Sequence, residues 1–411
     1  MILIEFYTPR HIENISTCLR LKPKKFHLIG LASEASDALN RYNALLAERH
    51  LPTRGKLENI VGDDFGELCV KLADLLAPKE QYVIDLSGGD ATAIMALGAV
   101  YAGLSPEKRK DIQVVRYDED LTNLLDCLNN YAPLPYEPVS LTVSELIQLH
   151  GGIITPESYQ PPKTFTAKHL ESLWALASDP KSNWNDNLTI LIQFQSYNQY
   201  ADGIRLELDS LVGEISDFSE KELALRDFLQ TLDKLGVIED RSSFDYLEYR
   251  YTDPTYRYCM EKAGNILELK VFLEARDLTE NGKPYFNDCL MSVSIDWDGI
   301  VHARKEKPDT RNEIDVIVMH GLIPTFISCK NGTINEAELY KLNTVANEFG
   351  GPHVQKLLLA TKPEAVSQGL WQRGFDMDIL LRSDIAPMSR QEWRTMFTHI
   401  EEELNHEKSA D

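Results

Sequence analysis

The fold of the C-terminal half is decided by the stretch NEIDVIVMHGLIPTFISCK, residues 312–330. This stretch predicts two short apolar strands joined by a turn. Alternate side chains of a strand share a face, so Glu313 and Asp315 point the same way. On the second strand, Ser328 and Lys330 also share a face. Acids on one strand and a lysine on its hairpin partner can hold a divalent cation beside a positive charge, which suits phosphodiester hydrolysis.

This hairpin resembles the core of the PD-(D/E)xK nucleases, in which an Asp ends one strand and an acid-x-Lys pair lies on the next. Here the acid position two residues before the lysine holds Ser328, which supplies no carboxylate. The candidate replacement acids are Glu313, on the face of Asp315, and Glu336 or Glu338 early in the following helix. Acids and lysines also decorate solvated hairpins, so a purely structural hairpin is the alternative.

The segment 259–276 predicts a helix with one buried stripe, formed by Ile266, Leu267, Val271 and Phe272. Glu268 lies near that stripe. Nucleases of this type carry an acid on the first core helix, and Glu268 is at the corresponding place. The alternative is a surface acid that pairs with Lys262 or Lys270. A predicted strand over 290–297 follows, so the order helix, strand, strand, strand, helix is that of the nuclease core.

Length and composition limit the classes of protein that this chain can belong to. A chain of 411 residues predicts two or three domains. No run of about 18 apolar residues exists, so we expect no membrane span. The N-terminus lacks a basic region before its apolar residues and predicts a first strand, not a signal peptide. The six cysteines form no CxxC pair, which indicates the reducing cytoplasm and neither disulfides nor a zinc site.

The formal net charge of −22 argues against tight, passive binding to nucleic acid. It does not exclude a nuclease, because bound metal ions and local basic patches can reverse the sign of the potential at a site. A candidate patch precedes the acid-bearing strand and consists of Arg304, Lys305, Lys307 and Arg311. The alternative for this patch is a solvated loop.

Residues 1 to about 135 alternate short apolar strands with helical patterns. The predicted strands are 2–6, 25–30, 57–60, 81–86 and 112–117. The predicted helices are 12–21, 33–49, 65–76, 91–101 and 121–129. This alternation indicates an α/β domain of Rossmann-like class, with a parallel sheet covered on both faces. Such sheets bind ligands at the carboxyl ends of their strands.

The loop after the first strand contains Thr8, Arg10 and His11. A hydroxyl, a guanidinium and an imidazole at a helix N-terminus suit a phosphate group. Arg10 and His11 can equally be ordinary surface residues.

The turn after the strand at 81–86 has the sequence Leu86-Ser87-Gly88-Gly89-Asp90-Ala91-Thr92. Its glycines let the backbone approach a ligand closely. The turn is neither a P-loop nor a dinucleotide fingerprint, so ATP hydrolysis and NAD chemistry gain no support. The alternative is a tight connection in which Asp90 caps the next helix.

The central region begins with a proline-containing linker from residue 151 to about 166. A helix over 219–236 and a hairpin over 237–251 then resemble a winged helix. The helix carries the acids Glu220, Glu222, Asp227 and Asp233, which disfavour contact with DNA. A scaffold or dimerisation module is therefore the preferred interpretation.

Taken in order, these segments resemble the CARF-domain nucleases of type III CRISPR systems, which join an N-terminal CARF sensor to a C-terminal PD-(D/E)xK nuclease. The nuclease half is matched at 262–268, 312–316, 327–332 and 340–351. The sensor half is matched by architecture and by Leu86–Gly89. CARF loops often continue with Thr-Lys, where this chain has Asp90-Ala91. The resemblance implies a CARF domain over 1–150, a linker and winged-helix-like region over 151–255, and a restriction-endonuclease-like domain over 256–411.

The resemblance implies a homodimer that binds a cyclic oligoadenylate, expected to be cyclic tetra-adenylate, and then cuts DNA, RNA or both in antiviral defence. We expect Glu268, Asp315 and the Cys329 carbonyl to hold Mn²⁺ or Mg²⁺, since hard ions prefer oxygen ligands. Glu313 or Glu338 would be an auxiliary ligand, and Lys330 would orient water or stabilise developing charge. CARF domains also occur on winged-helix regulators, so an adenylate-responsive nucleic-acid-binding protein with an inactive nuclease fold is the alternative.

Overall fold

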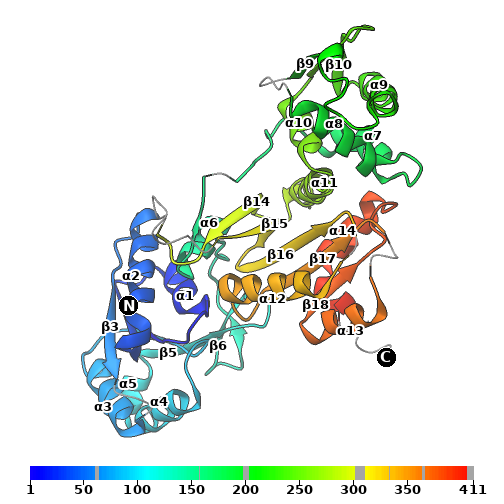
Figure 1. Ribbon diagram of the computed structural model, residues 1–411. Coiled ribbons are helices and arrows are strands. Elements are labelled where there is room, and N and C mark those ends of the chain that lie inside the picture. Colours follow the sequence, from blue (N-terminus) through cyan, green and yellow to red (C-terminus); the bar gives the residue numbers. More distant parts are fainter. Residues whose placement is uncertain are drawn as a thin grey trace.

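The computed structural model describes residues 1–60, 64–156, 158–197, 203–300, 311–332, 334–362 and 366–404. Figure 1 shows an N-terminal sheet with its helices (blue to cyan), a central helical region (green) and a C-terminal sheet (yellow to red). The C-terminal sheet lies between the other two parts. Within the described ranges, no helix has the length and apolar character needed to cross a membrane.

The N-terminal sheet has the strand order β3-β2-β1-β4-β5-β6-β7, and its first five strands in that order are parallel. These strands are β1 (Ile2–Phe6), β2 (Lys25–Leu31), β3 (Gly55–Ile60), β4 (Tyr82–Asp85) and β5 (Ile112–Tyr117). Helices α1 (Glu13–Leu21) and α2 (Ala32–Glu48) cover one face, and α3 (Phe65–Leu76) and α4 (Ala91–Gly103) cover the other. A short helix, α5 (Pro106–Arg109), precedes β5. The expected Rossmann-like parallel sheet is confirmed.

The predicted helix over 121–129 is wrong. Its place is taken by β6 (Leu124–Asp126), which pairs antiparallel with β5 and with β7 (Ala132–Pro133). The Asp118 carboxylate accepts the N–H groups of Thr122 and Asn123. Short polar side chains that bond to nearby backbone in this way compete with helix formation. Leu121 also has a φ of 51°, in the left-handed region that a helix excludes.

The C-terminal sheet has the order β18-β17-β16-β15-β14-β8 and is antiparallel from β8 to β16 and parallel from β16 to β18. Its strands are β8 (Ile153–Ile154), β14 (Asp288–Asp296), β15 (Arg311–His320), β16 (Ile323–Lys330), β17 (Gln355–Ala360) and β18 (Ile379–Arg382). One face packs on α11 (Asn265–Arg276) and α14 (Arg390–Thr398). The other packs on α6 (Val143–Leu149), α12 (Glu336–Gly350) and α13 (Gln368–Asp376).

The second of these faces belongs to a hydrophobic core that continues into the N-terminal sheet. Buried residues of α1 and α2 share one cluster with those of α6, α12 and the C-terminal strands. The helix α6 lies between the two sheets in Figure 1. Side chains from both sheets thus pack in one continuous apolar core. The strand ends of the N-terminal sheet are thereby held close to α12.

The described residues of the central region form α-helices, a 3-10 turn at Leu208–Ser210 and a small antiparallel sheet of order β10-β11-β9. The helices are α7 (Ala167–Ser178), α8 (Trp184–Gln195) and α9 (Phe218–Lys234), and the strands are β9 (Gly203–Glu207), β10 (Ile238–Asp240) and β11 (Tyr246–Tyr251). This is the expected arrangement of helices followed by a hairpin. Of the predicted basic patch, Arg311 starts β15, whereas Arg304, Lys305 and Lys307 lie outside the described residues.

Candidate functional site

Asp315 lies where β15 and β16 stop pairing through their backbones. The paired residues run from His320 with Ile323 to Val316 with Ile327. One position further, the Asp315 carboxylate accepts the Cys329 N–H at 2.6 Å and the Ser328 hydroxyl at 3.2 Å. At this position the Asp315 side chain, and not its backbone, provides the hydrogen bonds between the two strands. Ser328, in the position of the missing acid, serves as a hydrogen-bond donor to Asp315.

Glu268 comes to the same site from the first turn of α11. Burial and, after it, the negative charges of Asp315 and Glu313 together raise the pKa of this carboxyl to about 7. Burial also raises the pKa of Asp315, which the Cys329 N–H and the charge of Lys330 lower. The charge of Asp315 acts on Glu268, so the two carboxyls lie near each other. The helix and the hairpin therefore bring Glu268 and Asp315 together, as the sequence predicts.

Lys330 ends β16 near Asp315. Its Nζ lies 2.8 Å from Oε2 of Glu338, in the first turn of α12, and about a quarter of each side chain is exposed. Burial alone would lower the pKa of Lys330, but the Glu338 contact and the charge of Asp315 raise it on balance. Lys330 is therefore an ammonium group at neutral pH, held in place by Glu338.

Glu268 and Asp315 can supply two carboxylate ligands to a hard divalent cation. In the described part of the chain, no three His, Cys, Asp or Glu side chains gather into a metal-holding group. Mg²⁺ is commonly bound through one or two carboxylates and keeps several waters, so Glu268 and Asp315 suffice as protein side chains. A cation between them would also offset the repulsion that helps to raise the pKa of Glu268. Glu313 is exposed, and the Glu338 carboxylate is engaged by Lys330.

The Cys329 carbonyl remains an expected ligand that rests on the resemblance. The thiol of Cys329 is buried in the core beneath the sheet, and burial raises its pKa well above the ordinary value. The thiol is therefore neutral and does not contribute a thiolate to the site.

Two site residues were missed by the sequence reasoning. Tyr258, on α10 (Pro254–Glu261), donates its hydroxyl to Oε2 of Glu268 at 3.1 Å and lies 2.7 Å from Oγ of Ser292. No motif marks either residue, since a tyrosine on a helix and a serine in a strand are ordinary there. Their contact joins positions 34 residues apart and could be found only from the fold.

Replacing Glu268 with glutamine is expected to stabilise the metal-free protein at about pH 8. The folded pKa is about 7 against an ordinary 4.5, so between these values the folded protein holds a proton that the unfolded chain has lost. Stability from this group is therefore lost as pH rises. Glutamine keeps the acceptor for Tyr258 and cannot ionise, so the gain is at most about 3 kcal/mol and disappears near pH 4. Denaturant unfolding in EDTA measures this difference in the free energy of unfolding. If the free energies of the two proteins changed with pH in the same way, the raised pKa of Glu268 would be contradicted.

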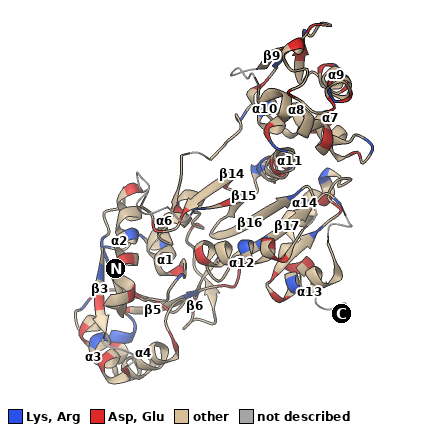
Figure 2. Cartoon of the chain, in the orientation of Figure 1, with Lys and Arg blue, Asp and Glu red and all other residues tan. Residues whose placement is uncertain are grey.

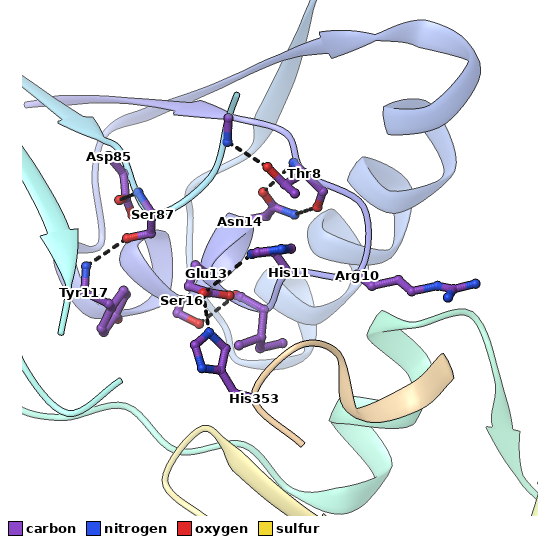
Figure 3. Close-up of polar contacts among 12 residues, drawn as sticks. Thr8, Arg10, His11, Glu13, Asn14, Ser16, Asp85, Ser87, Tyr117 and His353 are labelled. Atoms are coloured by element: carbon purple, nitrogen blue, oxygen red, sulfur yellow. Dashed lines mark hydrogen bonds and ion pairs between the residues drawn. The ribbon is translucent and has the colours of Figure 1, made fainter. Parts of the chain in front are cut away.

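The two predicted binding loops of the N-terminal sheet meet each other (Figure 3). The Thr8 hydroxyl accepts the Gly89 N–H at 2.7 Å. A Cβ on Gly88 would lie 2.3 Å from the Phe6 carbonyl, and Gly89 has a φ of 90°, so both positions require glycine. The loops are consequently packed backbone to backbone at the carboxyl ends of β1 and β4.

Several of the predicted ligand residues have structural partners. Ser87 accepts the Tyr117 N–H at 2.8 Å, and its own N–H bonds to Asp85. Asp90 caps α4 by accepting the Ala93 N–H, which is the alternative that the sequence left open. Leu86 packs on the core. Thr92 is half-buried in the first turn of α4.

Arg10 and His11 are directed toward the C-terminal half of the chain. Arg10 has a φ of 63° and forms an ion pair with Glu348 of α12 at 2.5 Å. The ring of His11 lies 3.6 Å from Glu13, which also contacts His353 at 2.8 Å (Figure 3). Burial of Glu13 opposes ionisation, but its contacts with the two histidines lower its pKa to about 2. The first binding loop and the first residue of α1 therefore contact the two ends of the segment 348–353.

Sequence comparison with protein families and with curated proteins finds no match. Among solved structures, protein VC1899 from Vibrio cholerae superposes with a TM-score of 0.73 at 15% identity, covering 98% of each chain. Can2 from Sulfobacillus thermosulfidooxidans, solved in complex with cyclic tetra-adenylate, superposes with a TM-score of 0.64 at 16% identity, covering 98% of this chain and 96% of that one. The expected fold class is confirmed, because the chain shares its fold with these proteins over nearly its whole length.

Proposed function

We propose that this chain is a metal-dependent nuclease that a cyclic oligoadenylate activates, and that it acts in type III CRISPR antiviral defence. The observation that carries the proposal is the meeting of Glu268, Asp315 and Lys330, which three different elements bring to one site. Two acids with raised pKa values beside an ammonium group suit the hydrolysis of a phosphodiester. The fold shared with Can2, which was solved with cyclic tetra-adenylate, supports the assignment of the activator.

The roles of the side chains follow from their partners. A bound Mn²⁺ or Mg²⁺ would supply a Lewis acid that activates water and neutralises phosphate charge. Glu268 and Asp315 would hold it, and the Cys329 N–H keeps the Asp315 carboxylate in a single orientation. Lys330 would stabilise the negative charge that develops on the phosphate, because its ammonium group is already positioned by Glu338.

The proposed ligand site lies where Thr8 meets Gly88 and Gly89, at the carboxyl ends of β1 and β4. We propose that the chain acts as a homodimer, since a two-fold symmetric ring suits an isologous pair of identical loops. The helix α4, which begins at this turn, supports a dimer. It contains no charged residue from Ala91 to Gly103, as its uniform tan colour in Figure 2 shows, yet Ile94 and Met95 are 47% and 61% exposed. Such apolar exposure marks an interaction surface.

The helix α12 would couple the ligand site to the nuclease site. Glu338 in its first turn holds Lys330, and Glu348 in its last turn holds Arg10 of the first binding loop. A ligand that moves this loop acts on one end of a rigid helix whose other end positions the catalytic ammonium group. Activation requires that the ligand bind one arrangement of α12 more tightly than the other.

A direct test incubates the full chain with Mn²⁺ and labelled single-stranded DNA, RNA or plasmid, with and without cyclic tetra-adenylate. We expect products only when both the metal and the ligand are present, and the substrate that is cut identifies the nucleic acid. A ligand-dependent gel shift without products would instead favour the regulator with an inactive nuclease fold. Cleavage that is independent of the ligand would contradict the proposed activation.

A further inference from the structure

The hydroxyl of Tyr258 lies between Glu268 and Ser292. A phenol has a single proton, which Tyr258 donates to Oε2 of Glu268 at 3.1 Å. Its oxygen is then free to accept the Ser292 hydroxyl at 2.7 Å. The three groups form a chain of hydrogen bonds in which Ser292 orients Tyr258 and Tyr258 orients the carboxylate. One oxygen of Glu268 is thereby fixed in direction, and the other is left for a ligand.

The backbone at Ser292 is irregular in the middle of β14. Its φ is 49°, a left-handed conformation that is costly for a residue other than glycine. The pairing of β14 with β15 is interrupted there, between Met291 opposite Val316 and Val293 opposite Ile314. Residues in such conformations persist only where their surroundings hold them.

The surroundings of Ser292 are provided by Ser158, Tyr159 and Gln160, which follow β8 and which we call the linker triad. The Gln160 side chain bonds to both the carbonyl and the N–H of Met291, at 2.6 and 3.3 Å. The Ser158 hydroxyl accepts the Ser294 N–H at 3.2 Å. The linker triad therefore bonds to β14 on both sides of Ser292.

The linker triad also contacts Tyr258 directly. The rings of Tyr159 and Tyr258 are stacked, with centroids 4.0 Å apart and planes inclined by 7°. A stacked pair at this distance limits how the Tyr258 ring can move. Tyr258 is consequently held by its ring through Tyr159 and by its hydroxyl through Ser292, and both restraints originate where the chain leaves the N-terminal half.

We propose that Tyr258 is a positioning residue that orients Glu268 toward the divalent cation, and that the linker triad fixes Tyr258 for this purpose. This inference rests on the proposed nuclease function. Groups that orient a metal ligand from outside its coordination sphere commonly change metal affinity by about 10- to 100-fold when they are removed. The linker triad would thus make the cation site sensitive to the path of the chain between the two halves of the protein.

The test is the affinity of the full chain for Mn²⁺, measured by isothermal titration calorimetry without substrate. Tyr258→Phe keeps the ring and its stack on Tyr159 but removes the proton given to Glu268. We expect Mn²⁺ binding to weaken about 10-fold or more, with an unchanged melting temperature and unchanged binding of cyclic tetra-adenylate. Ser292→Ala removes the orienting partner and is expected to give a smaller loss in the same direction.

The matched control is Tyr256→Phe, on the same helix. The Tyr256 hydroxyl bonds to the His169 carbonyl at 2.9 Å and not to Glu268, so Mn²⁺ affinity is expected to stay within about twofold of the original. Equal affinities for the Tyr258→Phe and Tyr256→Phe proteins would overturn the positioning role alone. Failure of the unaltered protein to bind Mn²⁺ would instead overturn the proposed metal site, so the two ideas fail in different ways.

Discussion

Replacing Lys330 with alanine is expected to lower ligand-activated cleavage by about 10²- to 10³-fold, the effect typical of losing one group that stabilises transition-state charge. Binding of cyclic tetra-adenylate is expected to be unchanged, because the ligand loops lie at the other end of α12. Glu338 loses its partner, but a carboxylate of which about a quarter is exposed remains solvated, and surface pairs contribute at most about 1 kcal/mol to stability. The rate should therefore fall without unfolding. Single-turnover cleavage at saturating Mn²⁺ and ligand measures it.

The control for this substitution is Lys283→Ala, in the short strand β13 (Lys283–Pro284), where the lysine is exposed. It removes the same charge from a chain whose net charge is already −22, so any long-range effect on the approach of a polyanion is matched. Equal cleavage by the Lys330→Ala and unaltered proteins would remove Lys330 from the site. Equal losses in both variants would assign the effect to overall charge.

The candidate site of the C-terminal half was predictable because the positions of its residues follow strand and helix periodicity. A period of two places Asp315 and Lys330 near each other once the hairpin is recognised, and the buried stripe of α11 directs Glu268 toward the sheet. Glu338 was expected as an auxiliary ligand, a role that stays a prediction, and the structure pairs it with Lys330. That pairing depends on how α12 crosses the end of β16, which local pattern does not specify.

The parts that the sequence did not reveal depend on contacts between distant segments or on unusual backbone conformations. The positive φ of Ser292 and its bond to Tyr258 arise from packing against the linker triad. The contact of Arg10 with Glu348 joins residues more than 300 positions apart. The error at 121–129 has a local origin. The Asp118 side chain accepts backbone N–H groups of the following residues and stabilises a turn in place of the predicted helix.

Replacing Met95 with glutamate is expected to convert the proposed homodimer into a monomer. Met95 lies on the exposed face of α4, which starts at the turn that carries Gly88 and Gly89, so this apolar face begins beside the proposed ligand site. In a two-fold symmetric dimer, each subunit would bury its own new carboxylate in the interface. Each buried, unpaired charge costs several kcal/mol, so the dissociation constant should rise at least about 100-fold. Light scattering after size-exclusion chromatography measures the change in mass.

Loss of the dimer should also remove ligand activation, since a ring on the two-fold axis needs the loops of both subunits. Leu223→Glu is the matched comparison and tests the other candidate interface, because Leu223 is 64% exposed against 61% for Met95 but lies on α9, in the region for which the sequence allowed a dimerisation role. We expect this variant to remain dimeric and to respond to the ligand. A dimeric Met95→Glu protein would remove α4 from the interface. A monomeric Met95→Glu protein that the ligand still activates would show that one subunit binds the cyclic oligoadenylate by itself. That result would contradict the two-fold ligand site but not the proposed nuclease site.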